Sequence, residues 1–205
     1  MDIEKIIEST VNKLELIDSA DISSIDLYMD QVTTFLEKHL KESKINEDDN
    51  ILTKTMINNY AKNNLLPPPE KKRYSKEHVI MLVFIYYFKN VMSINDIKKM
   101  LTPISEKYFD NNGSVKLEEI YNEMADMCRE EMEHMKEEIA HELKTSDNRF
   151  EDVPKEDKEF LRNFVMVCML SYDMYIKKQL LENIIDSMPQ PDDTKSKEKN
   201  KDKKK

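Results

Sequence analysis

The chain has 205 residues, of which 39% are hydrophobic and 36% are charged, and its formal net charge is −9 at pH 7. It contains one glycine, which excludes the glycine-rich loops of phosphate-binding and dinucleotide-binding enzymes and leaves little for tight turns. The composition therefore predicts an all-α fold without a catalytic site, in one domain or two closely joined ones. No apolar run reaches transmembrane length and the N-terminus is acidic, so we expect a cytoplasmic protein without a membrane partner.

Two amphipathic helices are predicted in the first part of the chain. Apolar residues recur on one face of residues 1–18, so the segment 1–24 should dock on another element. A second helix is predicted over residues 25–41 by the same criterion. A long turn with an acidic insert, Asn46–Asn50, separates it from the next segment.

The stretch Ile51–Leu101 is basic within an acidic protein. It holds nine Lys or Arg residues against three Asp or Glu residues, an excess that favours an anionic partner. Thr53 is placed to cap a helix, because its side-chain oxygen can accept from the free backbone N–H groups of the first turn. Apolar residues then recur on one side of this helix, and the other side has no carboxylate. That outer side carries Lys54, Thr55, Asn58, Asn59 and Lys62, whose groups donate to phosphate or read base edges.

Three prolines follow this helix. Pro67–Pro69 exclude helix and hold the chain extended. The next residues, Glu70–Tyr74, are thereby presented as a basic loop that contains Lys71, Lys72 and Arg73.

Two further helices are predicted before the middle of the chain. Ser75 can cap a strongly apolar helix over residues 76–89. Ser93 begins a pattern that resembles a capping box, which predicts another helix over residues 94–101. A connecting segment is expected from there on, because Pro103 follows.

The run MINNYAKNNLLPPP, residues 56–69, resembles the recognition helix and following turn of the MerR-type winged helix-turn-helix. Arg73-Tyr74-Ser75 stands where that family has wing residues, and residues 79–101 follow the spacing of its paired helices. The chain departs from the family at Asn58 and Asn59, which replace an Arg and a Tyr, and its short wing lacks a glycine. The chain also resembles a group of bacterial proteins that share a domain of unknown function.

The MerR resemblance implies a winged helix-turn-helix DNA-binding domain over residues 25–104. Its recognition helix, about 53–64, would enter the major groove beside a short basic wing at 70–74. The residues expected to contact DNA are Thr53, Lys54, Thr55, Asn58, Asn59, Lys62, Lys71, Lys72, Arg73 and Tyr74.

Residues 105–188 are predicted to form a helical hairpin that serves as a dimerisation or effector region. Residues 114–144 carry a narrow apolar stripe, Leu117–Leu143, which suits helix pairing and is the candidate dimer surface. The last helix, 155–188, has a much wider apolar face and is predicted to be the most buried helix. Residues 189–205 are rich in Lys, Asp and Ser and are predicted to form a disordered tail.

Two patterns resemble metal sites but are interpreted otherwise. Residues 108–119 have the shape of a calcium-binding loop, with Tyr108 where a carboxylate is needed. Residues 131–134 and 138–141 each read Glu-x-x-His, the unit of di-iron carboxylate bundles, but no second helix supplies a matching unit. We expect an ordinary turn and a solvated helix face, with no metal and no cofactor.

These observations predict a sequence-specific DNA-binding transcriptional regulator. One short helix reads few bases, so a homodimer on a palindromic site of double-stranded DNA is expected. The C-terminal helices would receive a small-molecule or protein effector. The alternative is a helical protein–protein interaction module that uses the helix-turn-helix scaffold without reading DNA.

Overall fold

The computed structural model describes residues 3–13, 16–44, 48–110, 113–147, 150 and 153–188. Within these residues the fold is all-α, as predicted from composition, with seven α-helices and one sheet of two short strands. None of the described helices is both long enough and apolar enough to cross a membrane. The predicted lysine-rich tail, residues 189–205, lies outside the described part of the chain.

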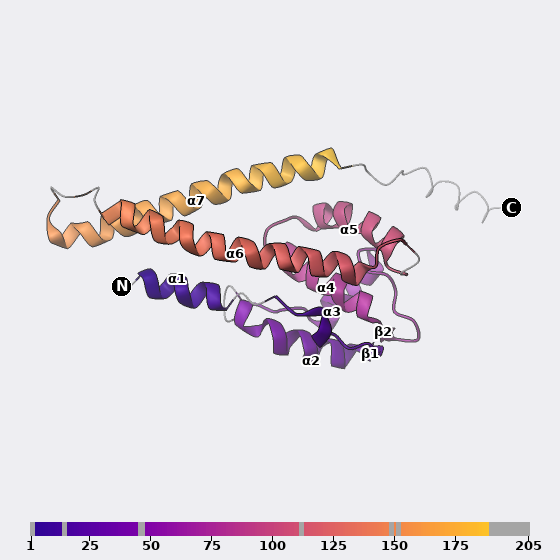
Figure 1. The fold of residues 1–205 in the computed structure, drawn as a ribbon. Helices are drawn as coiled ribbons and strands as arrows, with labels where there is room; N and C mark the ends of the chain where they lie inside the picture. Colours follow the sequence, from indigo (N-terminus) through magenta and orange to yellow (C-terminus); the bar gives the residue numbers. More distant parts are fainter. Residues whose placement is uncertain are drawn as a thin grey trace.

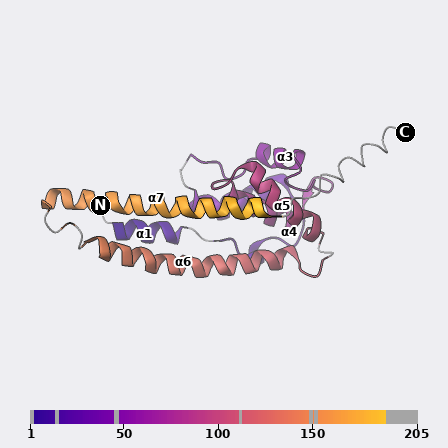
Figure 2. The ribbon, with the colours of Figure 1, turned by 90° about the horizontal axis from the view of Figure 1, so that it is seen from above.

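A compact group of helices carries a long helical hairpin (Figure 1). The helices are α1 (Ile3–Asn12), α2 (Met29–Leu40), α3 (Lys54–Lys62), α4 (Lys76–Phe88), α5 (Ile94–Tyr108), α6 (Leu117–Asp147) and α7 (Lys155–Ser187). The strands β1 (Leu27–Tyr28) and β2 (Arg73–Tyr74) pair antiparallel. From the group formed by α2 to α5, the two helices α6 and α7 extend as a hairpin, and α1 lies along α6 (Figures 1 and 2).

The core is built around α4. Its residues from His78 to Tyr86 are all buried, and it contacts α5, α6 and β2. A helix that is apolar on every side belongs in the interior, because any exposed side would leave apolar surface in water. The prediction that α7 is the most buried helix is wrong. Among the described residues of α7, only Met166 and Ile185 are buried.

β1 replaces the first turn of a predicted helix. The helix predicted over residues 25–41 begins at Met29 instead, because β1 pairs with β2 just before it. The Tyr28 backbone N–H donates to Gln31 Oε1 at 2.8 Å, which satisfies a free donor at the start of α2. Sequence periodicity could not reveal this pairing, because β2 lies far along the chain.

Pro103 lies inside α5, not beyond its end. The helix predicted to stop at Leu101 continues to Tyr108. Proline removes one backbone hydrogen bond from a helix. Here Ile104, Tyr108 and Phe109 pack against the core, and their burial offsets that loss.

The apolar stripe of α6 is largely used inside the chain. Leu117 and Tyr121 are buried in the core, and the Tyr121 hydroxyl donates to Ile17 O at 2.5 Å. Farther along α6, Met135 and Ile139 face α7 across a small cavity of about 80 Å³. This part of the stripe is therefore not available as the predicted dimer surface.

Candidate nucleic-acid interface

α3 is a short helix held by its cap and by two buried side chains. The Met56 backbone N–H donates to Thr53 Oγ1 at 3.2 Å, which confirms Thr53 as the N-cap. Ile57 and Tyr60 are buried on the inner side. The exposed outer side carries Lys54, Thr55, Asn58, Asn59 and Lys62. Because α3 contains no carboxylate, this side presents only amines, amides and a hydroxyl to a partner.

The loop after the prolines closes in a tight hairpin with two strained lysines. The Arg73 N–H donates to Glu70 O at 2.8 Å, and the two residues form an antiparallel bridge. Between them, Lys71 and Lys72 have φ angles of 49° and 66°. Two consecutive positive φ values are typical of a type I′ turn, in which Asn-Gly is preferred. Each left-handed lysine costs on the order of 1 kcal/mol, and such strain is concentrated at functional sites.

The two residues of β2 point to different surroundings. Arg73 is exposed, and its guanidinium carbon lies 5.5 Å from the centre of the Tyr28 ring. Tyr74 is only 3% exposed and packs edge-on against His78 at a centroid distance of 5.4 Å. Tyr74 is therefore a core residue, and its predicted contact with DNA is wrong for this fold. Its ring helps to hold β2, and with it Arg73, on the core.

Two lysines of the basic stretch hold the fold together. Lys76 Nζ lies 2.8 Å from Glu118 Oε1 and joins α4 to α6. Lys89 Nζ donates to the backbone oxygens of Asn50 and Ile51, each at 2.8 Å, and so ties the acidic turn to the end of α4. Burial lowers the pKa of Lys89. These cations serve the chain itself and are not part of a free basic surface.

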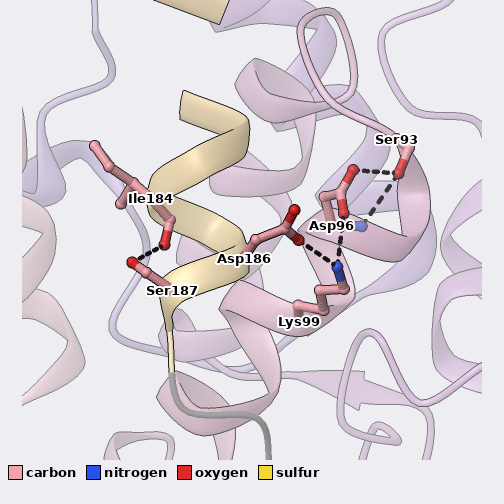
Figure 3. Close-up of polar contacts among 6 residues, drawn as sticks. All are labelled: Ser93, Asp96, Lys99, Ile184, Asp186 and Ser187. Carbon is pink, nitrogen blue, oxygen red and sulfur yellow. Dashed lines mark hydrogen bonds and ion pairs between the residues drawn. The ribbon is translucent and has the colours of Figure 1, made fainter. Parts of the chain in front are cut away.

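Lys99 links α5 to the end of α7 (Figure 3). Its Nζ lies 3.1 Å from Asp186 Oδ1 and 3.4 Å from Asp96 Oδ1. Hydrogen bonds to Asp186 and then Asp96 raise the pKa of Lys99. The Ser93 hydroxyl donates to Asp96 Oδ2 at 2.6 Å, and the Asp96 N–H donates to the same hydroxyl at 3.2 Å, which confirms the predicted cap. The charge of Lys99 is therefore largely neutralised within the chain.

A shallow groove of about 850 Å³ lies between α2 and the start of α3. Its lining consists of Thr33, Thr34, Glu37, Lys38, Lys41, Leu52, Thr53 and Lys54. Lys38 and Lys41 are exposed cations that the sequence analysis did not include. Lys38 lies one turn after Thr34 on the same face of α2, and Lys41 follows the end of that helix, where its Nζ lies 3.6 Å from Glu42 Oε1. The i, i+4, i+7 spacing of these residues is the sequence signal that indicates them. Lys54 forms an ion pair with Asp30 of α2, so an anion bound here competes with that carboxylate.

Metal-binding groups are not gathered in the described part of the chain. No three His, Cys, Asp or Glu side chains among those residues converge as a metal ion requires. Residues 111 and 112 of the calcium-loop pattern lie outside the described ranges. Cys128 and Cys168 are exposed free thiols. The outer side of α3 offers amines, amides and a hydroxyl instead.

Comparison with known families places the candidate interface inside one domain. Residues 17–124 match the family described as Domain of unknown function (DUF1836). The chain belongs to the DUF1836 family. The DUF1836 segment includes β1 to α5 and the first turns of α6, whereas α7 lies beyond it. No curated protein and no solved structure matches the chain. Both α3 and the lysine hairpin are therefore features of the DUF1836 segment.

Proposed function

We propose that this DUF1836 protein is a sequence-specific DNA-binding transcriptional regulator. The observation that carries the proposal is the pairing of a carboxylate-free outer side of α3 with a hairpin that holds Lys71 and Lys72 in left-handed conformations. α2 packs against both α3 and β2, so one helix supports both basic features. The resemblance of residues 56–69 to the MerR-type recognition helix supports the same function.

In the proposed complex α3 enters the major groove as the recognition helix. An α-helix with its side chains is about 10–12 Å across, which suits a groove roughly 12 Å wide, and the nine residues of α3 extend over about 13 Å. Asn58 and Asn59 lie on the exposed side, and asparagine can both donate to and accept from the edge of adenine. They are the residues proposed to read sequence.

The lysines and Arg73 are proposed to bind phosphates. Lys71 and Lys72 would contact the backbone from the hairpin, which acts as a short wing. Lys38 of α2 and Lys41 just beyond its end would extend this role to the groove beside α3. Lys54 would exchange Asp30 for a phosphate, which lowers its contribution relative to an unpaired lysine.

Selection of bound fragments from sheared genomic DNA tests the proposal. We expect enrichment of one inverted repeat, because a single α3 reads too few bases and a dimer would read two half-sites. The Asn58→Ala/Asn59→Ala variant should lose the preference for this repeat over an unrelated fragment. It should keep most of the weak binding that depends on charge.

A second variant removes positive charge without disrupting the fold of the hairpin. Lys71→Asn/Lys72→Gly installs the preferred type I′ sequence, so the hairpin stays intact while two cations are removed. We expect uniformly weaker binding, with a log-log salt slope that is shallower by about 2. The matched control is Lys98→Asn/Lys144→Asn, which also removes two exposed amines, from α5 and α6, and should bind as the unchanged chain does. If the hairpin variant binds as tightly as the control, the proposed wing is wrong.

The alternative is a helical protein–protein interaction module without DNA readout. It is favoured by the intramolecular partners of Lys76, Lys89 and Lys99, which leave a smaller basic surface than the sequence indicates. In that case no fragment is enriched, and Asn58→Ala/Asn59→Ala leaves the weak binding unchanged. This result would overturn the proposal of a DNA-binding regulator.

A further inference from the structure

α7 has two sides with different surroundings. One side faces α6, because Met169, Asp173 and Lys177 line a small cavity together with α6 residues that include Met135 and Ile139. The opposite side of α7, half a turn around the helix, carries a different set of residues and points away from α6. This outward face consists of Asp157, Phe160, Phe164, Val167, Cys168, Ser171, Met174, Tyr175 and Lys178.

The outward face is apolar and exposed over most of its length. Phe160, Phe164, Val167, Met174 and Tyr175 are each between 56% and 71% exposed, and the first two rings stack at a centroid distance of 6.3 Å. If each of these five residues has about 200 Å² of surface, a value typical of a large side chain, their exposed fractions give a total exposed area of roughly 600 Å². An apolar patch of that size marks an interaction site. It approaches the roughly 800 Å² that each partner contributes to a standard interface.

Between Asp157 and Lys178 this face carries no other charge, and one turn beyond Lys178 it continues to the exposed Glu182. Asp157 stands at one end and Lys178 at the other, and both are exposed. If two copies of α7 lie antiparallel about an axis between Val167 and Cys168, Asp157 of each copy is opposite Lys178 of the other. A parallel arrangement would place like charges together at both ends, which is unfavourable.

The same register also matches side-chain size. Phe160 of one copy lies opposite Tyr175 of the other, and Phe164 lies opposite the small Ser171. The Ser171 hydroxyl already donates to Val167 O at 2.6 Å, so its donor is satisfied when a ring covers it. The face is therefore complementary to itself in charge, size and polarity.

We propose that the outward face of α7 binds a second copy of this chain, antiparallel, with the two-fold axis between Val167 and Cys168. This contact uses a helix outside the DUF1836 segment and does not depend on whether the protein binds DNA. It also replaces the α6 stripe as the dimer surface, since that stripe packs against the core and α7.

Analytical ultracentrifugation of the full chain, without DNA, tests the contact. We expect a dimer for the unchanged chain. Val167→Glu should raise the dissociation constant at least about 100-fold, because it buries two unpaired carboxylates near the axis. Circular dichroism should show unchanged helix content, since Val167 is exposed in the single chain. Met127→Glu is the matched control, because Met127 is a similarly exposed apolar residue of α6, and this variant should remain dimeric.

The direction of the two helices is tested by disulfide formation. In a Cys128→Ser/Cys168→Ser background, Phe160→Cys and Tyr175→Cys chains should form a mixed disulfide when combined, and neither should do so alone. A charge exchange gives a second measure of direction. Asp157→Lys should weaken the dimer several-fold at low salt, and Asp157→Lys/Lys178→Glu should restore it.

Three results would overturn the proposal. They are a monomer at all concentrations, a dimer that Val167→Glu leaves intact, and disulfides formed by each single-cysteine chain alone. A monomer that binds phosphatidylcholine vesicles through Phe164 and Val167 would assign the face to a lipid surface instead. Failure of DNA selection with an intact dimer would overturn the proposed function alone.

Discussion

α4 and α7 are both rich in apolar residues, yet α4 is buried whereas α7 is largely exposed. α4 is buried from His78 to Tyr86, while eleven large apolar side chains of α7 are exposed. α4 is surrounded by α5, α6 and β2, whereas α7 packs on α6 along one side and on α5 near its end. A wide apolar face thus indicates that a helix will be covered, but not whether the cover comes from its own chain. In α4 it does, whereas for α7 we propose that a second copy of the chain supplies it.

The largest change in the free energy of unfolding is expected from shortening a side chain of α4. Leu82→Ala should lower the free energy of unfolding by about 2–5 kcal/mol, because it leaves a cavity at a fully buried position. Leu180→Ala makes the same chemical change at an exposed position of α7 and should alter that free energy by less than about 0.5 kcal/mol. Urea unfolding followed by circular dichroism measures both. Equal losses would contradict the contrast between the two helices.

A smaller effect is expected at the buried start of α6. Tyr121→Phe removes the hydroxyl that donates to Ile17 O and leaves that oxygen without this donor, at a cost of about 1–3 kcal/mol. Burial raises the pKa of Tyr121 to about 12, so the hydroxyl remains a donor at neutral pH. Tyr172→Phe on the exposed side of α7 is the control and should leave the midpoint of thermal unfolding unchanged.

His78 should make the stability of the core depend on pH. Burial lowers the pKa of His78 below its ordinary value of 6.5, although the Pro68 and Pro67 carbonyls and nearby carboxylates oppose this in part. As pH falls through 6.5, the unfolded chain binds a proton that the folded chain does not, so the free energy of unfolding decreases. Above pH 6.5 the contribution of His78 to the free energy of unfolding no longer changes with pH.

The measurement for His78 is the slope of unfolding free energy between pH 7.5 and pH 5.5. His78→Gln should flatten this slope, whereas His134→Gln on the exposed side of α6 should leave it as it is. If the slope is unchanged in His78→Gln, groups other than His78 cause the pH dependence. The comparison distinguishes a buried group of α4 from an exposed group of the hairpin helices.

The smallest effect, with the opposite sign, is expected at the surface hairpin. Lys71→Asn/Lys72→Gly should raise the free energy of unfolding by about 1 kcal/mol, because it relieves two left-handed lysines, while the greater freedom of the introduced glycine in the unfolded chain offsets part of the gain. Thermal unfolding at moderate salt checks this. A loss of stability would show that the lysines are not strained as their φ angles indicate.

The sequence predicted well what depends on neighbours along the chain. Thr53 and Ser93 begin their helices as predicted, because a cap acts on backbone groups within one turn. The continuous apolar run that follows Ser75 predicted a strongly apolar helix, and α4 lies there. The outer side of α3 was likewise evident from the spacing of Lys54, Asn58 and Lys62, because the helical period alone sets it.

The tertiary structure decided what depends on partners far along the chain. Tyr74 belongs to the core because β2 pairs with β1, and α5 continues through Pro103 because the partly buried Ile104 and Tyr108 pack against the core. Lys71 and Lys72 both take positive φ angles although lysine rarely does so, since the bridge between Glu70 and Arg73 closes the hairpin. The sequence by itself determined where most helices lie and which side of each is apolar, because helix caps and the helical period act between near neighbours. Only tertiary packing decided which apolar sides are covered within the chain, because that depends on how many neighbours can reach them, and α7 has too few.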